Sequence, residues 1–253
     1  MGGPTKLKRK IDHPARRVAL VSGAGRRLGE EIALALGSSG FDIAVVYNSS
    51  REGAEKVVAR LRDGGASAAG FHADISNPAD VRSLIRKIAS KFGRIDVLVN
   101  NAAVFFESPF VSVSEESWDR LININLKGTF LLSQAVSQVM LKQRSGRIIT
   151  LASIGGLQAW AKYTAYSVSK AGVIMLTKCM AKALAPHIMV NAIAPGTILM
   201  EGDRVENFVP IGSIPLKRYG APEDITSLVL FLANTSSYIT GQIISVDGGR
   251  SVQ

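Results

Sequence analysis

The sequence predicts an α/β fold in which one doubly wound parallel sheet carries helices on both faces. Two observations lead to this class. Short runs of apolar and β-branched residues alternate with segments of helical periodicity along nearly the whole chain. The first such run is followed by glycines and then by a helical pattern. Strands in a sheet covered on both faces are buried on both sides, which suits runs as apolar as these.

The individual elements follow in chain order from the two periodicities. Strands are expected where short apolar runs stand between turn residues, at 17–22, 41–47, 67–73, 95–99, 147–151, 188–193 and 242–246. Helices are expected after the turn at 23–29 and at 52–62, 78–92, 114–142, 163–185 and 222–233. A loop runs from the sixth strand through Pro215. No composition break or repeat divides the chain, so residues 17–253 are expected to form one domain.

Composition places the chain among ordinary globular proteins. Of its 253 residues, 47% are hydrophobic and 20% are charged, which suits a substantial core. No run approaches the ~18 apolar residues of a membrane span, and charges interrupt any signal-peptide core. We therefore expect a cytoplasmic protein without a membrane partner. The single cysteine, Cys179, cannot form an internal disulfide and is expected to be a small core residue.

The net charge of +10 raises the question of an acidic partner. The first 17 residues hold six of the basic residues and one acidic residue, so half of the excess is local. Residues 1–16 are expected to form a basic, flexible, solvated tail. The tail lacks aromatic residues that would stack on bases, so nucleic acid is not the expected partner.

The stretch 150–170 holds the candidate catalytic residues. Tyr166 and Lys170 stand four apart in a helical pattern and share a face, and Ser153 follows the apolar run that ends at Leu151. A phenol with an ordinary pKa of about 10 is a poor acid near neutrality, and a neighbouring ammonium lowers that pKa. Lys170 is expected to act in this way. Ser153 would then hydrogen-bond a substrate oxygen within reach of the Tyr166 proton.

The glycine-rich turn is the candidate cofactor site. Gly23, Gly25 and Gly29 stand between the first strand and its helix, the context that a dinucleotide turn requires. Glycines let the backbone approach a pyrophosphate, and the helix N-terminus offers free N–H groups to it. The turn therefore predicts dinucleotide binding by a Rossmann-type fold.

Together these motifs resemble the short-chain dehydrogenase/reductase family. That family carries, in this order, a Gly-x-x-x-Gly-x-Gly turn, an Asn-Asn-Ala segment, an Asn, a Ser and Tyr-x-x-x-Lys. The corresponding residues here are the turn at 23–29, Asn100 to Ala103, Asn125, Ser153, Tyr166 and Lys170. The resemblance extends from about residue 17 to the C-terminus. It implies an oxidoreductase with Asn125, Ser153, Tyr166 and Lys170 as catalytic residues, where Asn125 holds a water that links Lys170 to solvent.

The resemblance also implies which residues bind the cofactor. They are Gly23, Gly25, Arg26, Arg27, Leu28, Gly29, Asn48, Ser49, Ser50, Asp74, Ile75, Asn101, Ala102, Ala103, Tyr166, Lys170, Pro195, Gly196 and Ile198. Arg27 replaces the usual middle glycine and is a candidate to touch pyrophosphate or substrate. Asp74 matches the adenine-binding acid, and it is equally a candidate cap for the helix ahead of Pro78. Met200 stands where the family often has Thr.

The end of the second strand favours NADP(H) over NAD(H). An acidic residue there would bond the ribose 2′-hydroxyl and repel a phosphate. The sequence from Tyr47 to Arg51 has no carboxylate. Arg26 stands where NADPH-preferring members carry a basic residue, and Ser49 offers a hydroxyl donor.

The expected substrate is a small molecule whose carbonyl belongs to a ketone or a 3-oxoacyl group. Tyr166 is the expected proton donor. Ser153 favours this interpretation, because it suits the polarisation of a carbonyl oxygen. Pteridine reduction is the alternative: Arg27, Phe105 and the ending from Val246 to Ser251 resemble pteridine reductases. Several of those enzymes have Asp where this chain has Ser153. Phe105 is thus a candidate substrate contact that would stack on a flat ring, or a core residue.

Other expectations concern assembly, metal and class of protein. The apolar helices at 114–142 and 163–185 exceed what one sheet face covers, and the resemblance implies a homotetramer. His13, His72 and His187 stand apart from other ligand residues, so no metal is expected. A non-catalytic NADPH-binding regulator and a nucleic-acid binder that uses the tail remain alternatives, although neither explains the Ser-Tyr-Lys set.

Overall fold

A computed structural model describes residues 16–234 and 238–252. Seven parallel strands form one sheet in the order β3-β2-β1-β4-β5-β6-β7. The strands are β1 Val18–Ser22, β2 Asp42–Tyr47, β3 Ala68–His72, β4 Val97–Asn100, β5 Gly146–Leu151, β6 Ile188–Pro195 and β7 Ile243–Val246. The strand order reverses between β1 and β4, so the sheet is doubly wound and the predicted fold class is confirmed.

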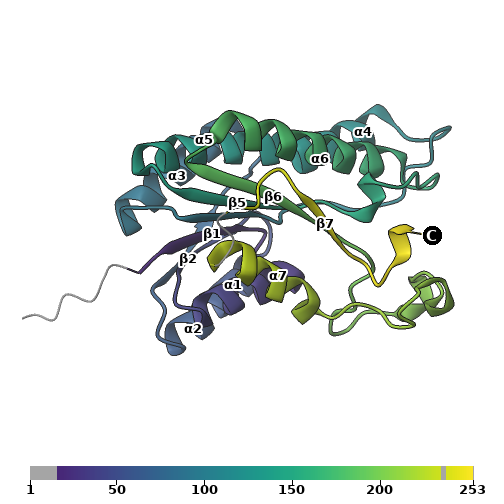
Figure 1. The fold of residues 1–253 in the computed structure, drawn as a ribbon, viewed down its shortest axis with the longest axis horizontal. Helices are drawn as coiled ribbons and strands as arrows, with labels where there is room; N and C mark the ends of the chain where they lie inside the picture. The colour runs from purple at the N-terminus through teal and green to yellow at the C-terminus, as the bar shows by residue number, and fades with distance from the viewer. Residues whose placement is uncertain (1–15, 235–237, 253) are drawn as a thin grey trace, which may run out of the picture.

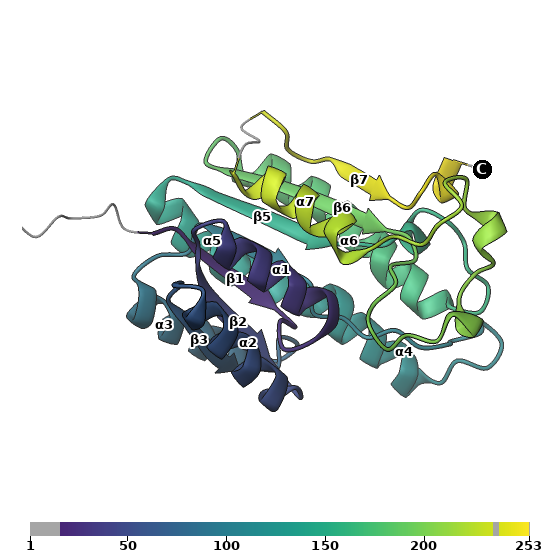
Figure 2. The same ribbon diagram turned by 90° about the horizontal axis from the view of Figure 1, so that it is seen from below.

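Helices cover both faces of this sheet (Figures 1 and 2). They are α1 Arg27–Ser38, α2 Arg51–Asp63, α3 Pro78–Phe92, α4 Glu115–Leu121, α5 Thr129–Gln143, α6 Thr164–Leu184 and α7 Pro222–Asn234. One apolar cluster joins the sheet to α1, α2 and α7, and a second joins it to α3, α5 and α6. No helix in the described part of the chain is both long enough and apolar enough to span a bilayer.

The alternation of side chains along β1 shows how the sequence produces these two layers. Ala19 and Val21 point into the cluster with α1 and α2, whereas Leu20 points into the cluster with α3 and α5. All three side chains are fully buried. A strand with apolar residues at every position is therefore stable only between two helical layers.

The long helix expected over 114–142 is interrupted by a π-helical turn. Ser114 caps its start by accepting a hydrogen bond from the Ser117 N–H, and α4 passes through the π-helical turn Ile122–Gly128 into α5. Such turns insert one residue into the hydrogen-bond ladder and are frequent at functional sites. Here the turn contains Asn125. The prediction that Cys179 is a core residue is wrong, because Cys179 lies on the exposed face of α6.

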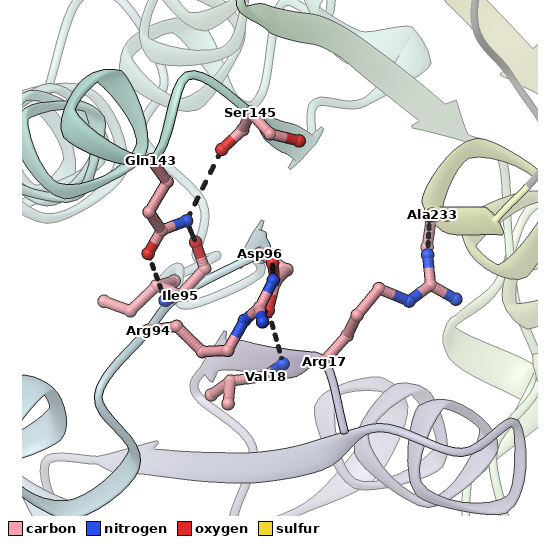
Figure 3. Close-up of polar contacts among 8 residues, drawn as sticks. All are labelled: Arg17, Val18, Arg94, Ile95, Asp96, Gln143, Ser145 and Ala233. Atoms are coloured by element: carbon pink, nitrogen blue, oxygen red, sulfur yellow. Dashed lines mark hydrogen bonds and ion pairs between the residues drawn. The ribbon is translucent and has the colours of Figure 1, made fainter. Parts of the chain in front are cut away.

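A carboxylate ties the beginnings of β1 and β4 together (Figure 3). Asp96 accepts a 2.8 Å hydrogen bond from the Val18 N–H and two from the Arg94 guanidinium. The Gln143 amide bonds both backbone groups of Ile95. These contacts fix the register of the two central strands, whose opposite ends form the site described below.

Residues 1–15 lie outside the described chain, and with them nearly all of the expected basic tail, including His13. Arg16 is described, and its guanidinium donates hydrogen bonds to the carbonyls of Gly40 and Gly65. The first described residue is therefore anchored beside β2.

Asp96→Ala should destabilise the fold because it leaves the buried Val18 N–H without its acceptor. A loss of about 1–3 kcal/mol in the free energy of unfolding is expected in urea at fixed protein concentration. Arg94→Ala removes only the partly exposed partner of the ion pair and should lose about 1 kcal/mol or less. Equal losses in the two variants would contradict the role given to the Val18 bond.

Candidate active site

The site lies where the strand order reverses, at the carboxyl ends of β1 and β4. The turn after β1 packs closely on Asn101, whose amide donates to the carbonyls of Ser22 and Gly23 at 3.0 and 3.2 Å. A Cβ at Gly29 would lie 2.2 Å from the Gly23 carbonyl oxygen and 2.5 Å from the Asn101 amide nitrogen. Gly29 is therefore required for the helix to begin this close to the strand ends.

A cavity of about 620 Å³ opens beside this turn. Most of the predicted cofactor residues line it: Gly23, Arg26, Arg27, Leu28, Gly29, Asn48, Ser49, Ser50, Asp74, Ile75, Asn101, Ala102, Ala103, Tyr166, Lys170, Pro195 and Gly196. Ser153 lines it as well. The turn at the N-terminus of α1 and the Ser-Tyr-Lys set, about 130 residues later in the sequence, thus face one space.

Two predicted cofactor residues do not line this cavity. Gly25 is buried against α2, where a Cβ would lie 2.4 Å from the Ser50 hydroxyl, so the close packing of the turn on α2 requires a glycine there. Ile198 lines a neighbouring cavity instead. The alternative role of Asp74 as a helix cap is wrong. Asn77 caps α3, whereas Asp74 accepts hydrogen bonds from the N–H and hydroxyl of Ser76.

Sequence reasoning missed several residues that line the cavity. Ile124 lines it from the π-helical turn. Most of the others lie at strand ends or shortly after them: Val46, Tyr47, Ala73, Val104, Leu151 and Ala152. Their position at the ends of predicted strands was a usable signal. Arg120 also lines the cavity and had no such signal, because it lies on the exposed side of a helical pattern.

Arg27 bridges the glycine turn and the segment that follows β6. Its backbone lies in the left-handed region with φ of 54°, which disfavours a residue with a side chain by about 1–2 kcal/mol. Its guanidinium forms two hydrogen bonds of 2.8 and 3.1 Å with Asp203. These bonds lower the pKa of the Asp203 carboxyl below its ordinary value. The pair therefore offsets part of the cost of the unfavourable backbone conformation.

Tyr166 and Lys170 lie one turn apart on α6 and face the end of β5. The Lys170 Nζ is buried, donates a 2.7 Å hydrogen bond to the Leu151 carbonyl, and lies 5.8 Å from the centre of the Tyr166 ring. Ser153 hydrogen-bonds Tyr166. A Cβ at Gly156 would lie 2.7 Å from the Lys170 backbone carbon, so the loop after β5 can approach α6 only because glycine stands there.

The expected effect of Lys170 on Tyr166 is wrong for the protein alone. Burial raises the pKa of the Tyr166 phenol above its ordinary value, and the hydrogen bond with Ser153 offsets this only in part. Burial also lowers the pKa of Lys170 from 10.5 to about 8. Desolvation is the largest cause of both shifts, and Tyr166 is a neutral phenol at neutral pH.

Asn125 braces the site with both ends of its amide. Its oxygen accepts from the Val104 N–H at 2.8 Å, and its nitrogen donates to the Val104 carbonyl and to the Ser169 hydroxyl at 3.0 and 3.1 Å. Ser169 donates in turn to the Tyr166 carbonyl. Both ends of the side-chain amide therefore bond protein groups, and the side chain links the segment after β4 to the helix that carries Tyr166.

A second cavity, of about 580 Å³, lies beside the first. Tyr166 and Ser153 line both cavities. The Phe105 ring stacks on Tyr163 at 4.7 Å and meets Tyr166 edge-on at 4.7 Å, and Trp160 lies parallel to Tyr166 at 6.3 Å. The interpretation of Phe105 as a core residue is wrong, because 57% of it is exposed. Among the described residues, no group of three or more metal-ligand side chains is present.

A dinucleotide-type turn and a Ser-Tyr-Lys cluster at one sheet edge define a dinucleotide-binding α/β protein. A family model described as enoyl-(acyl carrier protein) reductase matches residues 23–251. The 3-oxoacyl-(acyl-carrier-protein) reductase of Synechocystis is 44% identical over 237 residues, which cover 92% of this chain and 96% of that protein. The chain therefore belongs to the short-chain dehydrogenase/reductase family, an oxidoreductase family that uses a nicotinamide cofactor.

Further relatives agree with this placement. The 3-oxoacyl-(acyl-carrier-protein) reductase of Staphylococcus epidermidis is 42% identical over 238 residues, 91% of this chain and 97% of that protein. The crystal structure of acetoin dehydrogenase from Enterobacter cloacae has a TM-score of 0.88 at 34% identity and covers 95% of this chain and 97% of its own. A short-chain type dehydrogenase/reductase from Mycobacterium marinum has a TM-score of 0.88 at 35% identity, with coverages of 94% and 96%.

The lowered pKa of Lys170 predicts how stability depends on pH. Between about pH 8 and 10.5, Lys170 is protonated in a larger fraction of unfolded molecules than of folded ones. The free energy of unfolding therefore increases as the pH rises through this range. Relative to Lys170→Met, the parent should gain up to about 3 kcal/mol from pH 7 to 10.5 in urea unfolding. Parallel pH curves for the two proteins would show that Lys170 is not desolvated.

Proposed function

We propose that this protein is an NADP(H)-dependent reductase of carbonyl groups of the 3-oxoacyl or ketone type. The observation that carries the proposal is the hydrogen bond between Ser153 and the neutral Tyr166 phenol, above the buried Lys170, at the border of the two cavities. The names of the two bacterial relatives, both 3-oxoacyl reductases, support this choice of substrate.

The residues around the first cavity fit a nicotinamide dinucleotide. Arg26, which precedes α1, makes no side-chain cap, so the first N–H groups of that helix remain for a pyrophosphate. A side chain at Gly23 or Gly29 would clash with the residues around Asn101, so the turn can pack there only with glycines. Arg26, Asn48, Ser49 and Ser50 would hold the adenosine end, and Tyr166, Lys170, Pro195 and Gly196 the nicotinamide end. When bound, NADPH supplies a hydride to the substrate carbon.

The protein's own contribution is to place and protonate the carbonyl oxygen. Ser153 and Tyr166 present two hydroxyl groups to one point, and a carbonyl oxygen there accepts from both. Because burial keeps the phenol neutral, Tyr166 holds the proton that the oxygen needs as negative charge develops on it. The Lys170 ammonium then stabilises the phenolate that remains. Asn125 and Ser169 hold the Tyr166 backbone in place for this transfer.

Dihydropterin reduction is the second candidate, and the exposed Phe105 ring beside Tyr166 favours it. One face of that ring already stacks on Tyr163, which leaves the other face for a flat substrate. NADPH oxidation measured against ketones, 3-oxoacyl thioesters and dihydropterins separates the two candidates. Dihydropterin turnover faster than that of every carbonyl compound would reverse their order.

Tyr166→Phe should abolish turnover and leave NADPH binding nearly unchanged, because the phenol acts on the substrate. Steady-state kinetics and a fluorescence titration with NADPH measure the two effects. Tyr163→Phe is the matched control: its hydroxyl hydrogen-bonds Glu107, and its removal should have a much smaller effect. Activity of Tyr166→Phe within about tenfold of the parent, a loss of only ~1.4 kcal/mol, would exclude Tyr166 as the acid.

Arg26→Glu should weaken NADPH binding far more than NADH binding. The substitution replaces a cation near the expected 2′-phosphate with a carboxylate that repels it. The ratio of the two dissociation constants is the measurement, with Arg86→Glu on the exposed side of α3 as the control for net charge. Equal weakening of both cofactors would remove Arg26 as the discriminating residue.

A homotetramer is part of the same proposal. Exposed apolar side chains remain on the helices expected to pair, with Phe130 and Leu141 on α5 and Val168 and Met175 on α6. Helix faces of this kind are normally covered by a partner. Light scattering at micromolar concentration should give the mass of four chains, and Met175→Glu should reduce that mass. A monomer in both proteins would contradict the proposed assembly.

A further inference from the structure

The second cavity is lined by positively charged side chains that have no role in the proposed reaction. Among the described residues that line it, three are cationic, Arg27, Lys162 and Arg250, and none is Asp or Glu. Arg27 is paired with Asp203, and Lys162 is exposed to solvent. Arg250 is therefore the partly buried cation that this cavity presents.

Arg250 has no carboxylate partner among residues 16–234 and 238–252. It forms none of the ion pairs found there. Asp247 precedes it, but both oxygens of that carboxylate accept backbone hydrogen bonds, from the N–H groups of Gly249 and Ser251 at 2.9 and 2.7 Å. Burial accordingly lowers the pKa of the Arg250 guanidinium, with Asp247 opposing the shift by less.

The guanidinium is nevertheless held in a defined position. It lies 5.4 Å from the centre of the Trp160 ring and donates a long, 3.4 Å hydrogen bond to the Thr197 hydroxyl. Trp160 lies parallel to Tyr166 at 6.3 Å. Arg250 is therefore one aromatic ring away from the candidate proton donor, in the wall of the same cavity, with most of its hydrogen-bond donors unused.

Most of the rest of the wall is aromatic or aliphatic. Five residues supply rings and three supply aliphatic side chains: Phe105, Trp160, Tyr163, Tyr166 and Phe208, and Ile198, Met200 and Val209. Ring faces and edges favour a planar, conjugated group over a flexible chain. An arginine in such a wall binds a carboxylate through two parallel N–H groups.

We propose that Arg250 recognises a carboxylate on a flat, conjugated ketone, whose carbonyl lies between Ser153 and Tyr166 and whose ring lies against Phe105 and Trp160. This proposal rests on the proposed function for the site of reduction and adds the class of substrate. It makes Arg250 a specificity-determining residue that distinguishes an acid from its neutral ester.

Matched pairs of aryl ketones test it. The parent and Arg250→Met are compared in NADPH-dependent reduction of 4-acetylbenzoate, 4-acetylphenylacetate and the methyl ester of each. The parent should have a higher kcat/KM for each acid than for its ester. In Arg250→Met the acid-to-ester ratio should fall by about tenfold or more, the effect of losing a hydrogen bond to a charged group. Arg250→Lys should recover part of the ratio, and Arg86→Met should leave it as in the parent.

Two kinetic results would overturn the proposal: a parent that prefers the esters, or an Arg250→Met variant that loses activity equally on acid and ester. The second result would mean that Arg250 only supports Trp160, and a lower melting temperature would accompany it.

A binding measurement separates failure of this inference from failure of the proposed function. In a Trp118→Phe background, quenching of Trp160 fluorescence by 4-acetylbenzoate in the presence of NADP⁺ reports occupancy without turnover. Absence of reduction for every ketone and 3-oxoacyl thioester would remove the proposed function. Arg250-dependent quenching would still support the carboxylate site. Quenching that is absent, or equal in Arg250→Met, would contradict it.

Discussion

A buried ammonium at the carboxyl end of β5 is the constraint on which the site depends. Lys170 is almost fully buried, and its charge is met by the Leu151 carbonyl at 2.7 Å. Burial of this kind disfavours the charge and places its pKa at about 8. The fold tolerates it because Gly156 lets the loop after β5 close over α6, so that the lysine, the tyrosine and the serine occupy one small volume. The same exclusion of water keeps Tyr166 neutral.

Tyr166 is neutral, so the site carries a proton at its centre. A phenol whose pKa is raised is a weaker acid, and it keeps its proton until negative charge develops on a neighbouring oxygen. At neutral pH the site therefore holds the proton that the proposed reduction of a carbonyl would consume. Arg27 joins two parts of the site, because its pair with Asp203 connects the turn beside the first cavity to the segment after β6. Arg27 lines both cavities.

Much of this was predictable from sequence, and the exceptions have a common physical cause. The strands, the glycine turn and the shared face of Tyr166 and Lys170 follow from local periodicity and spacing. What failed depends on the tertiary environment. The direction of the Tyr166 pKa shift depends on how much water reaches the phenol. The partner of Arg27 lies 176 residues away, and the amide of Asn125 bonds the Val104 backbone, which no spacing rule predicts. Cys179 shares the apolar character of α6 but faces outward.

In the proposed reaction, hydride reaches a carbonyl carbon while the protein protonates the oxygen. The most direct test is reduction of a 3-oxoacyl thioester with NADPH deuterated at C4 on the transferred face, followed by NMR of the product. We predict a 3-hydroxyacyl thioester with deuterium on C3, the carbon that bore the oxygen. An unlabelled product, or label delivered only to the carbon–carbon double bond of an enoyl thioester with the 3-oxo compound untouched, would contradict it.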